Sequence, residues 1–181
     1  PLVNSVNGEE ASMKRVLPLV AEYGTAVIGL VMDDDGIPPT AEGRLAVAAK
    51  IVERAGKLGI PPENILIDCL ALTVGADSQA GWITLEAIRL VKEKLGVNLA
   101  LGASNVSFGL PARRLVNRVF ARLAVEAGCD SGLVDPEQIN AASLQSLDLE
   151  SEPFRLARAL LLGEDEFGLE FITAYREGRL A

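Results

Sequence analysis

Short apolar runs alternate with longer amphipathic segments along the chain, and this alternation restricts the possible fold more than any other feature. The run TAVIGLVM at 25–32 is continuously apolar, which is typical of a strand buried on both faces. After the loop DDDGIPPT, the segment 41–58 carries Leu45, Ala48, Val52 and Ala55 at helical spacing. The same pair of patterns recurs further along. The sequence therefore predicts repeated strand–helix units.

The repeats predict five strands and at least five helices. Alternation of this kind indicates a parallel sheet with right-handed crossovers. Pro18, inside the first helical segment, is expected to kink or break it. Strands are expected at 2–4, 25–32, 65–68, 99–102 and 131–134, and helices at 9–23, 41–58, 82–95, 111–127 and in the remainder.

Two α/β architectures compete, a doubly wound open sheet and part of an eight-stranded TIM (β/α)8 barrel. Polar residues follow the apolar runs, and in a barrel the carboxyl ends of all strands meet at one mouth. The phosphate-binding patterns GxGxxG and GxxxxGK[ST] are absent, which weakens the nucleotide-binding alternatives. A full barrel needs about 250 residues. We therefore expect a single domain over 1–181 that forms the C-terminal five βα units, strands four to eight, of a TIM barrel.

Composition and charge exclude several classes of function. The 181 residues carry a net charge of −8, which disfavours nucleic-acid binding, and no histidine, which removes the commonest general base and zinc ligand. Cys69 and Cys129 lie in or beside apolar runs, so buried free thiols are expected rather than a disulfide or a metal site. No run of 18 apolar residues appears. These features favour a soluble, cytoplasmic protein.

Three polar residues at predicted strand ends are candidates for ligand binding. Asn4 has two equal interpretations, a ligand contact or a turn or cap residue. Asp68 lies between two apolar runs without an adjacent cation, and a buried carboxylate must be paired, hydrogen-bonded or functional. Asn105 is too far upstream of the helix at Pro111 to cap it. Such donors and acceptors suit a flat heterocycle such as a pterin better than a phosphorylated sugar.

The segments PLVNSVNGE, MDDDGIP, ILIDCLALTVGADSQAG and SNVSFGLPARRLVNR resemble the pterin-binding methyltransferases along essentially the whole chain. Within that family they are similar to methyltetrahydrofolate:corrinoid/iron–sulfur protein methyltransferase and to the folate domain of cobalamin-dependent methionine synthase. The resemblance implies a TIM barrel that passes a methyl group from methyltetrahydrofolate to the cobalt of a corrinoid, such as cobalamin. The corrinoid is carried by a partner protein or domain.

The resemblance also implies roles for single residues. Asn4 and Asp68 would hydrogen-bond the pterin, and Asn105 would act in catalysis at the nitrogen that bears the methyl group. Gly102 would leave room for the ring, and Ser107 and Arg113 complete the predicted pterin-binding set, with no metal ligand. At Phe108 the chain departs from relatives that have a polar residue, so this ring is expected to stack on or cover the ligand.

Other functions stay open at this point. The family places a further pterin-binding Asp on its third strand, which this sequence does not include. We therefore expect a shortened gene product or a barrel completed elsewhere, weak or no catalysis by this piece alone, and a homodimer that covers exposed sheet edges. A non-catalytic pterin-binding fragment, a dihydropteroate synthase-like enzyme and a barrel without a ligand are the alternatives.

Overall fold

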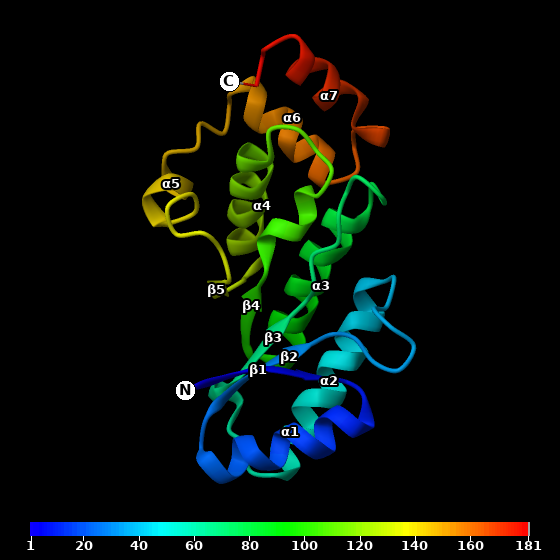
Figure 1. The fold of residues 1–181 in the computed structure, drawn as a ribbon, viewed down its shortest axis with the longest axis vertical. Coiled ribbons are helices and arrows are strands. Elements are labelled where there is room, and N and C mark those ends of the chain that lie inside the picture. The colour runs from blue at the N-terminus through cyan, green and yellow to red at the C-terminus, as the bar shows by residue number, and fades with distance from the viewer. Residues whose placement is uncertain (181) are drawn as a thin grey trace. The chain divides into compact units, whose positions relative to one another are not determined.

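The chain folds as an α/β protein in which each of the first four strands is followed by a helix (Figure 1). A computed structural model describes residues 1–180. The predicted order of elements is confirmed. The strands are β1 (Leu2–Asn7), β2 (Ala26–Leu30), β3 (Ile65–Asp68), β4 (Asn98–Leu101) and β5 (Ser131–Gly132). The helices are α1 (Glu10–Tyr23), α2 (Ala41–Lys57), α3 (Ala80–Leu95), α4 (Arg113–Ala127), α5 (Ala141–Gln145), α6 (Glu152–Leu161) and α7 (Leu169–Arg176).

Two local expectations are corrected. Helix α1 is not broken at Pro18. Pro18 cannot donate to the carbonyl of Lys14, but both residues are exposed, so water can replace the missing bond. On α2, Leu45 and Val52 are only half-buried. The fully buried stripe lies further round the helix and includes Val47 and Ile51.

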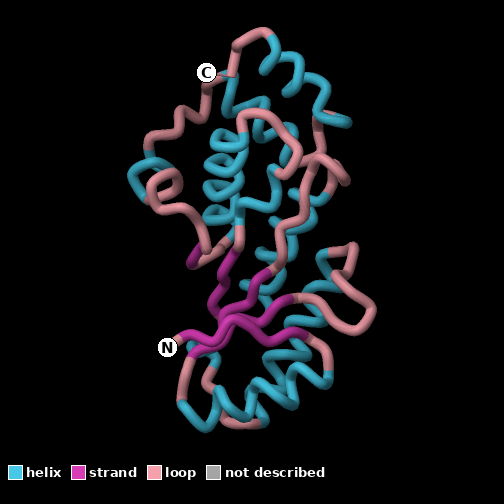
Figure 2. Tube along the Cα trace, viewed as in Figure 1, coloured by secondary structure: helices cyan, strands magenta, loops and turns pink. Residues whose placement is uncertain are grey.

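The five strands form one sheet in the order β1–β2–β3–β4–β5, and β1 to β4 pair in parallel (Figure 2). Within residues 1–180, β1 and β5 are the two ends of this order, so the sheet does not close on itself. The predicted fold class, five parallel βα units, is confirmed.

The chain divides into two compact units, which are described separately. Unit 1 comprises Pro1–Leu70, Glu86–Leu101 and Ala127–Ser131. Unit 2 comprises Ala71–Leu85, Gly102–Glu126 and Gly132–Ala181, of which the structure describes all but the last residue.

In unit 1 one face of the sheet packs against helices. Gly29 of β2 shows the closeness of this packing, because a Cβ atom there would lie 3.1 Å from Cγ2 of Ile51 on α2 and 3.0 Å from Cδ1 of Ile67 on β3. Ile51 and Ile67 are fully buried. The row of side chains that includes Gly29 and Ile67 therefore faces α2, and neighbouring positions on each strand face the opposite side.

Unit 2 has a core formed by its helices. Phe120 of α4 and Phe171 of α7 are fully buried. A Cβ atom at Gly81 on α3 would collide with the carbonyl oxygen of Leu161, so only glycine permits this approach. The buried Asp165 accepts hydrogen bonds from the backbone N–H groups of Glu170 and Phe171, at 3.1 and 2.9 Å, and so caps the start of α7.

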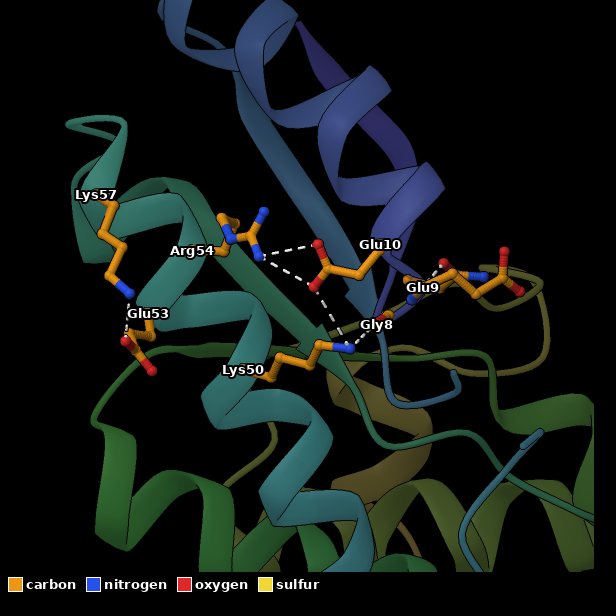
Figure 3. Close-up of polar contacts among 8 residues, drawn as sticks. Gly8, Glu9, Glu10, Lys50, Glu53, Arg54 and Lys57 are labelled. Atoms are coloured by element: carbon orange, nitrogen blue, oxygen red, sulfur yellow. Dashed lines mark hydrogen bonds and ion pairs between the residues drawn. The ribbon is translucent and has the colours of Figure 1, made fainter. Parts of the chain in front are cut away.

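An ionic contact in unit 1 joins α1 to α2 (Figure 3). Nη2 of Arg54 donates to both carboxylate oxygens of Glu10 at 3.0 Å, and Nζ of Lys50 lies 3.8 Å from the same carboxylate. Lys50 also donates to the carbonyl of Gly8 at 2.6 Å. The hydrogen bond from Arg54 lowers the pKa of Glu10 below its ordinary value of 4.5. The start of α1 is thereby held against the middle of α2.

No helix within residues 1–180 combines the length and apolarity needed to cross a membrane.

Replacing Glu10 by Gln is predicted to lower the melting temperature slightly at pH 7. Because folding depresses the pKa of Glu10, its contribution is present above pH 4.5 and is lost as the pH falls through the lower, folded-state pKa. The difference between wild type and Glu10→Gln should therefore be smaller at a pH below the folded-state pKa than at pH 7. Thermal denaturation followed by circular dichroism at both pH values measures it.

Glu53→Gln is the matched control, because Glu53 pairs with Lys57 inside α2 at 2.6 Å and joins no second element. It should change the melting temperature less than Glu10→Gln does. Equal melting temperatures for wild type and Glu10→Gln at pH 7 would show that the contact between α1 and α2 contributes nothing.

Candidate functional site

Asp68 is the last residue of β3 and is only 8% exposed. Its Oδ1 accepts a hydrogen bond of 2.8 Å from the backbone N–H of Leu70, and its carbonyl accepts one of 3.2 Å from Val31. Leu70 has a φ of 58°, in the left-handed region that non-glycine residues rarely occupy. The carboxylate is thus held by a tight turn of residues 68–70, which we call the Asp68 turn.

Strand register places Asn4 and Asp68 on the same face of the sheet. Asn4 of β1 pairs with Ile28 of β2, which in turn pairs with Leu66 of β3. Asp68 is two residues beyond Leu66 on β3 and pairs with Leu30. Positions two apart on a strand share a face. The intervening row contains Gly29 and faces α2. Asn4 and Asp68 therefore lie on the sheet face opposite the one that packs against α2.

Asn4 is not the end of its strand, as the sequence had indicated, because β1 continues to Asn7. The pairing shifts between Asn4 and Val6, and this irregularity brings Asn7, rather than Asn4, opposite Leu30 in the same row as Asp68. Oδ1 of Asn7 accepts from the N–H of Glu9 at 3.2 Å, so this side chain stabilises the turn into α1. Asn4 is exposed on the edge strand.

A hollow of about 450 Å³ lies beside the same end of β1 in unit 1. Ser5, Asn7, Ser12, Arg15 and Leu30 contribute to its wall. It is polar and open, and Asn4 and Asp68 do not line it.

In unit 2 the predicted catalytic amide, Asn105, lies in a 3₁₀ turn, Ala103–Ser107, that directly follows β4. Its side chain is exposed, and its carbonyl accepts from the N–H of Phe108 at 3.2 Å. Gly102 precedes the turn and is half-buried.

Arg113, at the start of α4, holds this 3₁₀ turn. Its Nε donates to Oγ of Ser107 at 3.0 Å and its Nη2 donates to the carbonyl of Ser104 at 3.1 Å. Ser107 is fully buried and donates to the same carbonyl at 3.3 Å. The guanidinium lies 4.7 Å from the centre of the Phe108 ring, within the range of a cation–π contact. Three predicted site residues, Asn105, Ser107 and Arg113, are thus brought together in unit 2.

The Phe108 ring is 54% exposed and borders a second hollow, of about 600 Å³, in unit 2. Leu110, Leu160, Phe167 and Ile172 supply much of the apolar part of this hollow, with Thr73 and Asp77 at its polar side. Oγ1 of Thr73 donates to the carbonyl of Phe108 at 2.7 Å, which fixes the backbone beneath the exposed ring.

Both cysteines are buried free thiols, as predicted. Burial raises the pKa of Cys69 well above its usual range and raises the pKa of Cys129 to about 11. Both thiols are therefore protonated at neutral pH, and neither can act as a thiolate nucleophile. Among residues 1–180 the structure gathers no group of three or more potential metal ligands.

Arg44 of α2 was not predicted from the sequence as a residue near the site. This arginine is 1% exposed and donates to the carbonyls of Cys69 and Leu70, both at 2.9 Å. Its position was informative, because Arg44 occurs at helical spacing among Ala41, Ala48 and Ile51, where an apolar residue is expected.

Comparison with known proteins identifies the family. Residues 1–135, which run from β1 through β5, match the family described as pterin binding enzyme. The chain belongs to this family. Pterin-binding enzymes are TIM-barrel proteins, so β1 to β5 are strands of that fold.

Individual relatives agree with this membership. Methionine synthase of Mycobacterium tuberculosis is 37% identical over 150 residues, which are 76% of this chain and 13% of the relative. Methionine synthase of Mycobacterium leprae is 36% identical over 151 residues, 76% of this chain and 12% of the relative. Methylcorrinoid:tetrahydrofolate methyltransferase of Eubacterium limosum is 32% identical over 182 residues, 99% of this chain and 64% of the relative. The chain thus spans less than two thirds of each of these proteins.

Replacing Arg113 by Gln is predicted to loosen the 3₁₀ turn that carries Asn105. The change removes the charged donor that joins Ser104 to Ser107, so backbone amides of residues 103–110 should exchange about fivefold faster, as expected for the loss of about 1 kcal/mol of local stability. Hydrogen–deuterium exchange with mass spectrometry measures this directly.

Arg114→Gln is the control, because Arg114 is the exposed neighbour on the same helix. It should leave exchange in residues 103–110 unchanged. Equal exchange in wild type and Arg113→Gln would rule out Arg113 as the residue that holds the turn.

Proposed function

We propose that this pterin-binding enzyme takes part in methyl transfer between methyltetrahydrofolate and the cobalt of a corrinoid carried by a partner protein or domain. The observation that carries the proposal is Asp68, a buried carboxylate held by a backbone N–H at the end of β3, on the sheet face opposite the helices. Two relatives are named for methionine synthesis and one for transfer between a methylcorrinoid and tetrahydrofolate.

Asp68 is proposed to bind the aminopyrimidine edge of the pterin. An ionised carboxylate only accepts hydrogen bonds and has about four acceptor positions, and the N–H of Leu70 occupies one of them. The pterin edge presents N–H donors in a fixed plane. A carboxylate that is oriented before the ligand arrives loses less conformational entropy on binding than a mobile one. Asn4, which shares this face, is proposed as a second pterin contact.

Asn105 is proposed to interact with the pterin nitrogen that carries the methyl group. An amine is a poor leaving group, and a hydrogen bond that strengthens as the carbon–nitrogen bond breaks lowers the barrier. An amide can donate or accept, so it can follow the change at this nitrogen. Its exposure on a 3₁₀ turn fixed by Ser107 and Arg113 supports this assignment. Ser107 and Arg113 then contribute mainly by holding the turn, and Gly102 leaves room for the ring.

The corrinoid cobalt supplies the nucleophile, so the chain needs neither a histidine base nor a thiolate. The work of this chain is to bind and orient the pterin and to stabilise charge at the departing nitrogen. The same contacts stabilise the transition state in both directions. The direction written in the name of the Eubacterium limosum relative and its reverse therefore require the same residues.

Replacing Asp68 by Ala is predicted to weaken the binding of methyltetrahydrofolate about tenfold or more, because hydrogen bonds to a charged group are lost from a buried site. Replacing Asn105 by Ala should lower the rate constant for methyl transfer about 100-fold or more, with a smaller effect on Kd, since its interaction strengthens in the transition state. Isothermal titration calorimetry gives Kd, and transfer of a labelled methyl group to cob(I)alamin gives the rate.

The control is Asn98→Ala, at the opposite end of β4 from Asn105, where the amide donates only to the carbonyl of Glu63 at 3.0 Å. It should change neither Kd nor rate. An unchanged Kd in Asp68→Ala would contradict the proposed pterin contact. Binding without any methyl transfer by the wild-type chain would favour a non-catalytic pterin-binding role.

A further inference from the structure

A fully buried arginine, Arg44, lies next to the proposed pterin contact. Arg44 is among the largest fully buried side chains of the structure, with 1% of its surface exposed. Burying a charged group is costly unless hydrogen bonds compensate for the lost water. A leucine or methionine at this position of α2 would fill the same space at lower cost. The hydrogen bonds of Arg44 therefore indicate which role its charged side chain has.

Three hydrogen bonds from Arg44 go to main-chain carbonyls in two different segments. Nη1 donates to Cys69 and to Leu70, both at 2.9 Å, and Nε donates to Pro38 at 3.1 Å. Pro38 lies in the loop before α2, whereas Cys69 and Leu70 belong to the Asp68 turn. The planar guanidinium, with donors in fixed directions, thus ties the turn to the loop in one geometry.

The Asp68 turn needs such support. Leu70 adopts a left-handed backbone conformation that is unfavourable for a side chain with a Cβ atom, and such conformations persist only where the surroundings enforce them. In this conformation the N–H of Leu70 points to Oδ1 of Asp68 at 2.8 Å. Arg44 binds the carbonyl of the same residue whose N–H orients the carboxylate.

We propose that Arg44 is a positioning residue for pterin binding, which holds the Cys69 and Leu70 carbonyls so that the Leu70 N–H orients the Asp68 carboxylate toward the ligand. The inference rests on the proposed function, since it assigns Arg44 a role that acts through Asp68. In this role Arg44 acts on the backbone of the turn, through its bonds to the Cys69 and Leu70 carbonyls.

A double-mutant cycle tests this coupling. Methyltetrahydrofolate is titrated into four proteins, namely wild type, Arg44→Met, Asp68→Ala and the double variant. We expect Arg44→Met to weaken binding about tenfold when Asp68 is present, and to change Kd by less than about twofold in the Asp68→Ala background, because residues that act through one another are not additive. Equal weakening in both backgrounds would overturn the inference, since Arg44 would then act independently of Asp68.

A second measurement follows the turn itself and needs no ligand. The Leu70 amide should exchange with solvent faster in Arg44→Met than in wild type, as measured by nuclear magnetic resonance. Arg44→Lys, which keeps the charge and one donor group, should give values of Kd and exchange rate between those of wild type and Arg44→Met. It replaces Arg44→Met in both measurements if that variant does not fold. An unchanged Leu70 exchange rate in both variants would overturn the inference.

Arg54→Met is the matched control on the same helix. Arg54 binds Glu10 of α1 and has no hydrogen bond to the Asp68 turn. It should lower stability without changing Kd or Leu70 exchange. If Asp68→Ala weakens binding and Arg44→Met does not, the inference about Arg44 alone is wrong. If Asp68→Ala leaves Kd unchanged, the proposed pterin contact is wrong, and the inference falls with it.

Discussion

Close packing of α2 against the sheet of unit 1 is the constraint on which the proposed pterin site depends. Gly29 permits Ile51 to approach β2 closely. The row of strand positions that includes Gly29 and Ile67 therefore packs against α2. Parallel register then sends the alternate rows to the other face, and these rows carry Asn4 and Asp68. A shift of one residue in β3 would bury the Asp68 side chain against α2 and remove it from the ligand face.

Each unit uses an arginine from a helix to hold a polar turn at the end of a strand. Arg44 binds the carbonyls of the Asp68 turn in unit 1, and Arg113 binds Ser104 and Ser107 in the 3₁₀ turn that carries Asn105 in unit 2. In both, the arginine donates to backbone carbonyls near the proposed ligand-binding side chain. Such support fixes the positions of the ligand-binding groups before the ligand binds. A site that works by orientation and hydrogen bonding depends on this preorganisation.

Periodicity predicted the order of strands and helices because each βα unit buries its own apolar face, and the bounds of β3 agree with the pattern ILID. Local propensity did not locate the end of β1, since its extension to Asn7 depends on pairing with β2. The residues Asn4, Asp68 and Asn105 were proposed as ligand contacts because polar side chains after apolar runs are unusual, and these assignments stay predictions. Arg44 was missed because the carbonyls that it binds in the Asp68 turn lie 25 and 26 residues further along the chain, which no local pattern reveals.

The most direct test of the account is a crystal structure of this chain with methyltetrahydrofolate bound. The account predicts that the aminopyrimidine edge of the pterin lies within hydrogen-bonding distance of the Asp68 carboxylate, on the sheet face opposite α2, with the Leu70 N–H still bonded to Oδ1. A pterin bound away from Asp68, for example in the apolar hollow beside Phe108, would contradict it.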